Sequence, residues 1–111
     1  MDRERLHRLL RLGFEKGASD IHFQVGCLPL YRFNGELVEL RFKLLEPADT
    51  EAMVRILMNC EPGQDLGRVS EVDLAYEIAG EGRFRVNISR ERRSFNIVLR
   101  VIPIRSSRST T

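Results

Sequence analysis

The sequence is poor in aromatic residues, has no tryptophan, and contains only two cysteines and no long apolar run. Aromatic residues make up 7% of the chain, too few to supply a platform on which the bases of single-stranded nucleic acid would stack. Cys27 and Cys60 form no metal-ligand motif, which favours free thiols over a disulfide or a metal site. No apolar stretch approaches the ~20 residues that a membrane-spanning helix needs.

The sequence also lacks the motifs of catalytic sites. None of its eight glycines begins a Gly-x-x-x-x-Gly-Lys-Ser/Thr loop, the loop that cradles nucleotide phosphates. No nucleophile–base arrangement is evident, and no cluster of residues has the spacing of metal ligands. We therefore expect no catalytic residues, metal or cofactor in this chain on its own.

The composition is that of a soluble globular protein. The 111 residues suffice for one domain with a modest core, and 42% of them are hydrophobic and 31% charged. The first residues, Met1 to Glu4, open a charged amphipathic helix and do not resemble a signal peptide. The expected compartment is the cytoplasm.

Basic residues concentrate in the last part of the chain. From Gly82 onward there are eight arginines and one acid, a net charge of +7, whereas the residues before Gly82 carry a net charge of −5. One end of the fold is therefore expected to attract an anionic partner.

Apolar residues at helical spacing predict a helix over Asp2–Lys16, with Gly17 as its natural stop. His7 falls on the polar side of this helix and is expected to be solvated. A second helix is predicted to begin at Pro47 and to end near Asn59.

Strict alternation of apolar and polar residues predicts strands between and after these helices. The first strands are expected over Asp20–Val25, Leu30–Phe33, Glu36–Leu40 and Val72–Ala79. The order of elements predicts an α+β fold, a curved antiparallel sheet of about six strands with helices packed on one face, topologically similar to a PAS-like sheet. The domain is expected to span residues 1–104, and residues 105–111 are expected to form a disordered tail.

The stretches Gly82–Asn87 and Val98–Pro103 predict an antiparallel hairpin, closed by a four-residue loop over Glu91–Ser94. Pairing Val86 with Leu99, and likewise Ile88 with Ile97, makes the two apolar faces coincide. A slip by one residue would turn one apolar face to water, which fixes the register.

The same register places Arg85 directly opposite Arg100 on the outward face. Two like charges in opposite positions are destabilising, and arginine is suited to forked recognition of phosphate or carboxylate. The pair therefore suggests an anion site, and the alternative is a solvated face with acidic neighbours. Asp73 and Glu77 would lie beside this face if their strand pairs with the hairpin.

Asp20 and His22 project from the same side of the first predicted strand. The pair suggests either acid–base chemistry or a local hydrogen bond, and the spacing of two residues on a strand is more typical of the latter.

Several short motifs, in order, resemble one protein family. Gly17–His22 and Arg32–Leu37 are similar to the opening of the type II/IV secretion ATPases. Glu71–Tyr76, Gly82–Asn87 and Leu99–Pro103 resemble the PilT-type pilus retraction ATPases in particular. The match extends over nearly the whole chain. The family departs from this sequence in the loop over residues 90–94, where it often has a Gln-Arg-Gly-like segment.

The resemblance implies an N-terminal PAS-like domain of a hexameric motor that works at the inner-membrane base of a pilus or secretion machine. ATP, with Mg²⁺, would lie between this domain and a C-terminal RecA-like ATPase domain that carries the phosphate loop. Arg85 and Arg100 occupy motif positions whose arginines reach the phosphates. Arg83 is a further candidate, with a structural ion pair as the alternative. Asp20 and His22 match the family motif without an assigned role.

Two other classes of function remain open at this stage. A stand-alone PAS-like sensor or interaction module would need an enclosed apolar pocket. A nucleic-acid binder using the basic end would show steeply salt-dependent binding, but no nucleic-acid partner is expected.

Overall fold

The computed structural model describes residues 2–59, 70–78, 82–91 and 94–102 of the chain. Two helices and six strands are formed by these residues, in the order α1 (Arg3–Lys16), β1 (Asp20–Phe23), β2 (Leu30–Phe33), β3 (Glu36–Glu39), α2 (Pro47–Leu57), β4 (Glu71–Ile78), β5 (Gly82–Glu91) and β6 (Ser94–Ile102).

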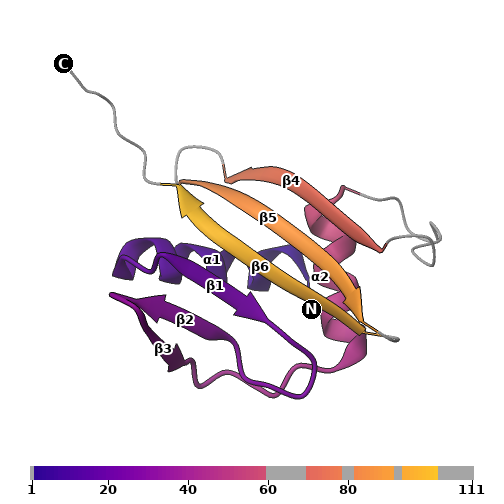
Figure 1. The fold of residues 1–111 in the computed structure, drawn as a ribbon, viewed down its shortest axis with the longest axis horizontal. Helices are drawn as coiled ribbons and strands as arrows, with labels where there is room; N and C mark the ends of the chain where they lie inside the picture. Colours follow the sequence, from indigo (N-terminus) through magenta and orange to yellow (C-terminus); the bar gives the residue numbers. More distant parts are fainter. Residues whose placement is uncertain (1, 60–69, 79–81, 92–93, 103–111) are drawn as a thin grey trace.

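The six strands form one antiparallel sheet in the order β3-β2-β1-β6-β5-β4. Both helices pack against the same face of this sheet, and no other described element covers the opposite face (Figure 1). The predicted α+β architecture is confirmed. The first strand lies beside the last one, so the two halves of the chain meet at the centre of the sheet.

Helix α1 begins and ends where its capping residues require. The side chain of Asp2 accepts a hydrogen bond from the backbone N–H of Arg5 at 2.9 Å, and Gly17 ends the helix in the left-handed conformation with φ of 83°. Helix α2 begins at Pro47, as predicted, and ends at Leu57, close to the predicted end.

The core lies between the helices and the sheet. It is built from large side chains that alternate along the strands and from the apolar stripe of α1; the most buried include Leu6, Leu10, Ile21, Phe23, Tyr31, Met53, Phe84, Ile97 and Leu99. The hydroxyl of Tyr31 donates a hydrogen bond to the carbonyl of Leu9, which ties β2 to α1. Gly82 leaves room for the ring of Phe14, because a Cβ there would lie 2.8 Å from the ring.

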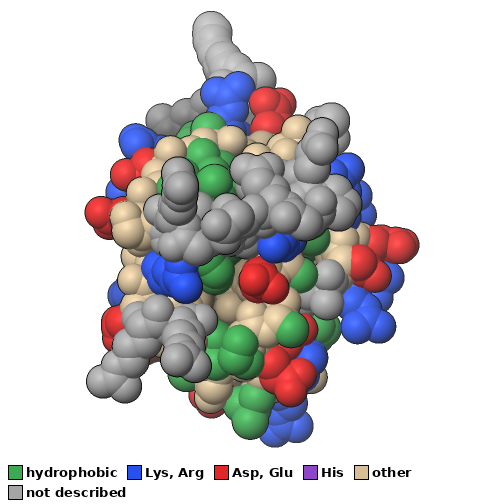
Figure 2. All heavy atoms as spheres, turned by 90° about the vertical axis from the view of Figure 1, so that its right-hand side faces the viewer, with side chains coloured by type: hydrophobic (Ala, Val, Ile, Leu, Met, Phe, Trp, Pro, Cys, Tyr) green, Lys and Arg blue, Asp and Glu red, His purple; other side chains and the backbone are tan. Residues whose placement is uncertain are grey.

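The edge strand β3 carries exposed apolar side chains. Leu37 is 50% exposed and Val38 is 46% exposed, and Phe42 and Leu44 follow shortly after the strand. The two ends of the strand are glutamates, a charge placement that discourages strand addition at an open edge. Elsewhere on the surface, basic and acidic side chains are interspersed among apolar groups (Figure 2).

The predicted register of the last hairpin is confirmed, since Val86 pairs with Leu99 and Ile88 with Ile97. The predicted four-residue loop is wrong, because Glu91 and Ser94 pair with each other as strand residues. The strands continue further than hydrophobic alternation alone indicated, since backbone pairing does not require apolar side chains. The first strand, in contrast, ends at Phe23 instead of Val25.

His7 is not merely solvated, as the sequence suggested. Its Nε2 lies 2.5 Å from the hydroxyl of Tyr76, and the two rings meet edge to face with their centroids 5.6 Å apart. This contact ties α1 to the edge strand β4, which carries Tyr76. Cys27 is a free thiol, whereas Cys60, Ala79 and the predicted tail lie outside the described residues.

Candidate anion-binding site

The open face of the sheet carries a row of charged side chains that crosses four strands. Strand register places Arg32 of β2 opposite Asp20 of β1, Asp20 opposite Arg100 of β6, and Arg100 opposite Arg85 of β5. Directly opposite residues in a sheet project from the same face, so the four side chains form one line. Three of the four are arginines.

The two arginines that the sequence placed together are neighbours in the structure. Both are exposed, and the side chain of Arg100 is 76% accessible. Among the residues that the structure describes, Arg85 makes no ion pair or side-chain hydrogen bond. The two side chains border an open hollow on the outer face of the sheet, which Asp73, Asn87 and Val98 also line.

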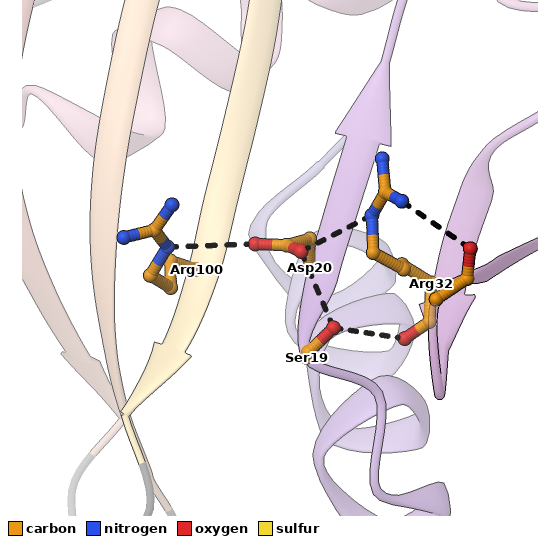
Figure 3. Close-up of polar contacts among 5 residues, drawn as sticks. Ser19, Asp20, Arg32 and Arg100 are labelled. Atoms are coloured by element: carbon orange, nitrogen blue, oxygen red, sulfur yellow. Dashed lines mark hydrogen bonds and ion pairs between the residues drawn. The ribbon is translucent and has the colours of Figure 1, made fainter.

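Asp20 lies between two of the arginines and contacts both. Its Oδ2 is 3.4 Å from Nε of Arg32, and its Oδ1 is 3.6 Å from Nε of Arg100 (Figure 3). The hydroxyl of Ser19 lies 3.2 Å from Oδ2 of Asp20. The Asp20 side chain is only 18% exposed, so the row has a sheltered carboxylate at its centre.

Figure 3 shows that Arg100 uses only Nε toward Asp20 and that its two terminal nitrogens point away from this carboxylate. The ends of the guanidinium fork are thus left accessible beside Arg85. This arrangement can bind an oxyanion such as phosphate, because two nitrogens of one guanidinium can donate to two oxygens.

Arg83 lies apart from this pair. Its terminal nitrogen is 3.5 Å from the carboxylate of Glu77 on β4, and both side chains are more than half exposed. The ion pair that the sequence offered as the alternative for Arg83 is present. Asp73 likewise lies beside the arginine face, as the pairing of β4 with β5 was expected to bring about, and it accepts a hydrogen bond from Asn87 at 2.9 Å.

His22 occupies the next row of the open face, opposite Leu30 and Val98. Burial lowers the pKa of His22, the charge of Asp20 opposes this shift, and the charge of Arg32 adds to it. Among the described residues, Asp20 directs its oxygens to Ser19 and the arginines, and no hydrogen bond joins it to His22. The structure therefore supplies no acid–base pair here.

The His22 imidazole is predicted to titrate below its ordinary pKa of 6.5, and proton NMR of the chain measures this directly. Because a lowered folded-state pKa disfavours the charged form, its contribution to stability is complete above the unfolded-state pKa and is lost as the pH falls through the folded-state pKa. His22→Gln should reduce the loss of stability below pH ~6.5. A His22 pKa above 6.5 would contradict the prediction.

Comparisons with known proteins find relatives by sequence and by structure, although no family model matches the chain. The chain is 33% identical over 95 residues to the type IV pilus retraction ATPase PilT of Pseudomonas aeruginosa and 35% identical over 95 residues to the type IV pilus ATPase PilU of the same organism. Each match covers 86% of this chain. A solved structure of the pilus retraction motor PilT with bound ADP matches with a TM-score of 0.73 at 34% identity over 87% of the chain.

The chain is homologous to the N-terminal domain of the pilus and secretion ATPases. It spans 28% of the length of PilT and 25% of the length of PilU, about a quarter of these curated relatives. The ATPase DotB of Legionella pneumophila matches the fold with a TM-score of 0.79 over 93% of the chain, at 22% identity.

Family resemblance had marked Asp20 without giving it a role, and sequence reasoning missed Ser19 and Arg32 as parts of the site. Arg32 follows buried Tyr31 along β2, so alternation predicts that Arg32 lies on the outer face. Alternation does not predict that Asp20 is its neighbour there. In the described part of the chain, no group of three or more potential metal ligands is present. No helix there is long and apolar enough to cross a membrane.

Proposed function

We propose that this chain is the N-terminal regulatory domain of a hexameric pilus retraction or related secretion ATPase. In this proposal, ATP with Mg²⁺ binds at a C-terminal RecA-like domain, and Arg85 and Arg100 contact its phosphates when the two domains close. The motor acts in the cytoplasm, at the inner-membrane base of the pilus or secretion machine. The homology to PilT and PilU, and the ADP bound in the PilT structure, support this assignment.

The observation that carries the proposal is the exposed pair Arg85 and Arg100 on the sheet face opposite α1 and α2. Two guanidiniums in opposite positions of a sheet repel each other by a few tenths to ~1 kcal/mol. An anion between them attracts both guanidiniums and so outweighs their repulsion, and charge-assisted hydrogen bonds to phosphate are among the stronger ones in proteins. An open sheet face also gives a second domain room to approach.

The proposed mechanism is closure of one domain on another around the nucleotide. Arg85 lies on β5 and Arg100 on β6, and these two strands share the longest run of paired residues in the sheet. Domain closure would therefore move the two arginines toward the phosphates as one rigid unit. Phosphate charge is then offset only in the closed state, which couples nucleotide occupancy to domain rotation. The isolated chain is expected to bind ATP weakly, because most phosphate contacts belong to the other domain.

The proposal predicts that Arg85→Ala or Arg100→Ala, made singly in the longer ATPase, lowers kcat/KM for ATP by about tenfold or more. Losing one hydrogen bond to a charged group costs about 1.5–3 kcal/mol, and each 1.36 kcal/mol is tenfold in rate. Arg8→Ala is the matched control, because Arg8 is exposed on α1 at the opposite face of the sheet. Unchanged turnover in both site variants would remove the proposal.

The alternative of a stand-alone sensor finds no support in the described residues. A sensor needs an enclosed apolar pocket, whereas large side chains such as Phe23, Tyr31 and Phe84 fill the space between sheet and helices. The hollow beside the arginines is open and lies on the outer face.

A further inference from the structure

Three of the motifs that resemble the family converge on one set of polar contacts. Ser19 and Asp20 come from the first motif, Arg32 and Gly35 from the second, and Arg100 from the last. The contacts run from the Gly35 carbonyl in the turn after β2 to the Arg32 guanidinium on β2, then to the Asp20 carboxylate on β1 and the Arg100 guanidinium on β6 (Figure 3). Of these four groups, only the guanidinium of Arg100 borders the hollow beside Arg85.

The two oxygens of Asp20 have unequal surroundings. Oδ2 lies within 3.4 Å of both the Ser19 hydroxyl and Nε of Arg32. Arg32 is itself held at its far end, where a terminal nitrogen donates to the carbonyl of Gly35 at 3.4 Å. With Oδ2 fixed on one side, Oδ1 is left to face Nε of Arg100.

We propose that Asp20, held by Arg32, is a positioning residue that orients the guanidinium of Arg100 toward an anion shared with Arg85. This inference rests on the proposed function for the identity of the anion, a nucleotide phosphate. Asp20 itself contacts no anion. Its carboxylate engages Nε of Arg100 and leaves the two terminal nitrogens for the ligand.

The physical reason is the freedom of the Arg100 side chain. A side chain that is 76% exposed samples many rotamers, and ordering a rotamer-rich side chain on binding costs affinity. A sheltered carboxylate at one end of the guanidinium removes part of that freedom before the anion arrives. An ion pair with one exposed partner contributes modestly, so the expected effect is a few-fold change in affinity.

Simple electrostatics makes the opposite prediction. If Asp20 acted only as a negative charge near the site, its removal would strengthen anion binding. If it positions Arg100, its removal weakens anion binding even though the site becomes more positive. The sign of the change therefore distinguishes the two roles.

The experiment titrates the 111-residue chain with inorganic pyrophosphate. NMR signals of the arginine Nε–Hε groups report both the affinity for pyrophosphate and the mobility of each arginine side chain. Asp20→Asn is expected to weaken pyrophosphate binding about twofold to fivefold and to make the Arg100 Nε–Hε group more mobile in the free chain. Arg32→Ala should act in the same direction. The two changes combined should cost less than the sum of the single effects, because they act through one contact. Glu39→Gln is the matched control, since Glu39 is an exposed acid at the sheet edge.

Asp20→Glu is a second variant, in case Asp20→Asn impairs folding. It keeps the charge but moves the carboxylate by one methylene, so positioning predicts an intermediate affinity and electrostatics predicts the original one. Unchanged or tighter binding by Asp20→Asn, with the backbone spectrum intact, would overturn the inference. If the parent chain binds no pyrophosphate, the phosphate role loses its support, and the mobility of Arg100 in the free chain still decides for or against positioning.

Discussion

Alanine at both Arg85 and Arg100 is expected to lower kcat/KM for ATP in the longer ATPase by about 100-fold or more. Each guanidinium that contacts a phosphate contributes about 1.5–3 kcal/mol, and two contributions in this range multiply in rate. Steady-state ATP hydrolysis of the purified longer protein measures the effect.

Lysine variants separate charge from geometry in the same experiment. Arg85→Lys and Arg100→Lys keep the positive charge but lose the planar fork that donates to two oxygens. We expect them to recover only part of the lost activity. If lysine restored it fully, the site would need positive charge alone and the forked geometry would be irrelevant.

The matched control removes two charges from the other side of the sheet. Arg5→Ala combined with Arg8→Ala alters two exposed residues of α1, and the side chain of neither is bound to another described residue in the structure. This variant should hydrolyse ATP as the parent does. A loss equal to that of the Arg85 and Arg100 variant would point to net charge as the cause.

The hairpin of β5 and β6 was predictable because the sequence pattern that determines its register lies within the two strands themselves. Alternation assigns each residue to a face, and the requirement that both apolar faces coincide leaves one register. That register alone placed Arg85 opposite Arg100. The same reasoning overestimated the length of the loop, because it assumed that the strands end where their apolar residues end.

The contact between Asp20 and Arg100 was not predictable in this way. These residues are separated by most of the chain, and periodicity within β1 does not say which strand lies beside it. Only the order of strands in the sheet brings the first strand next to the last. The role of Arg32 was hidden for the same reason, because it requires two strand pairings at once.

Phe84→Ala is predicted to destabilise the chain by about 3–5 kcal/mol, a large part of the stability of a small domain. Phe84 is 1% exposed, and its ring meets that of Phe14 edge to face at a centroid distance of 6.4 Å. Truncation removes buried apolar area and leaves a cavity beneath β5, where the ring packs against α1. Urea unfolding followed by circular dichroism measures the change in the free energy of unfolding.

Phe42→Ala is the matched control, the same chemical change at a side chain that is 39% exposed. It should cost less than ~1 kcal/mol. Equal losses at the two positions would contradict the assignment of Phe84 to the core. The comparison also bears on the site, because Phe84 faces inward between Arg83 and Arg85, which face outward. The burial of this ring fixes the strand that carries Arg85, so a folded Phe84 variant with a loosened core should also bind pyrophosphate less tightly.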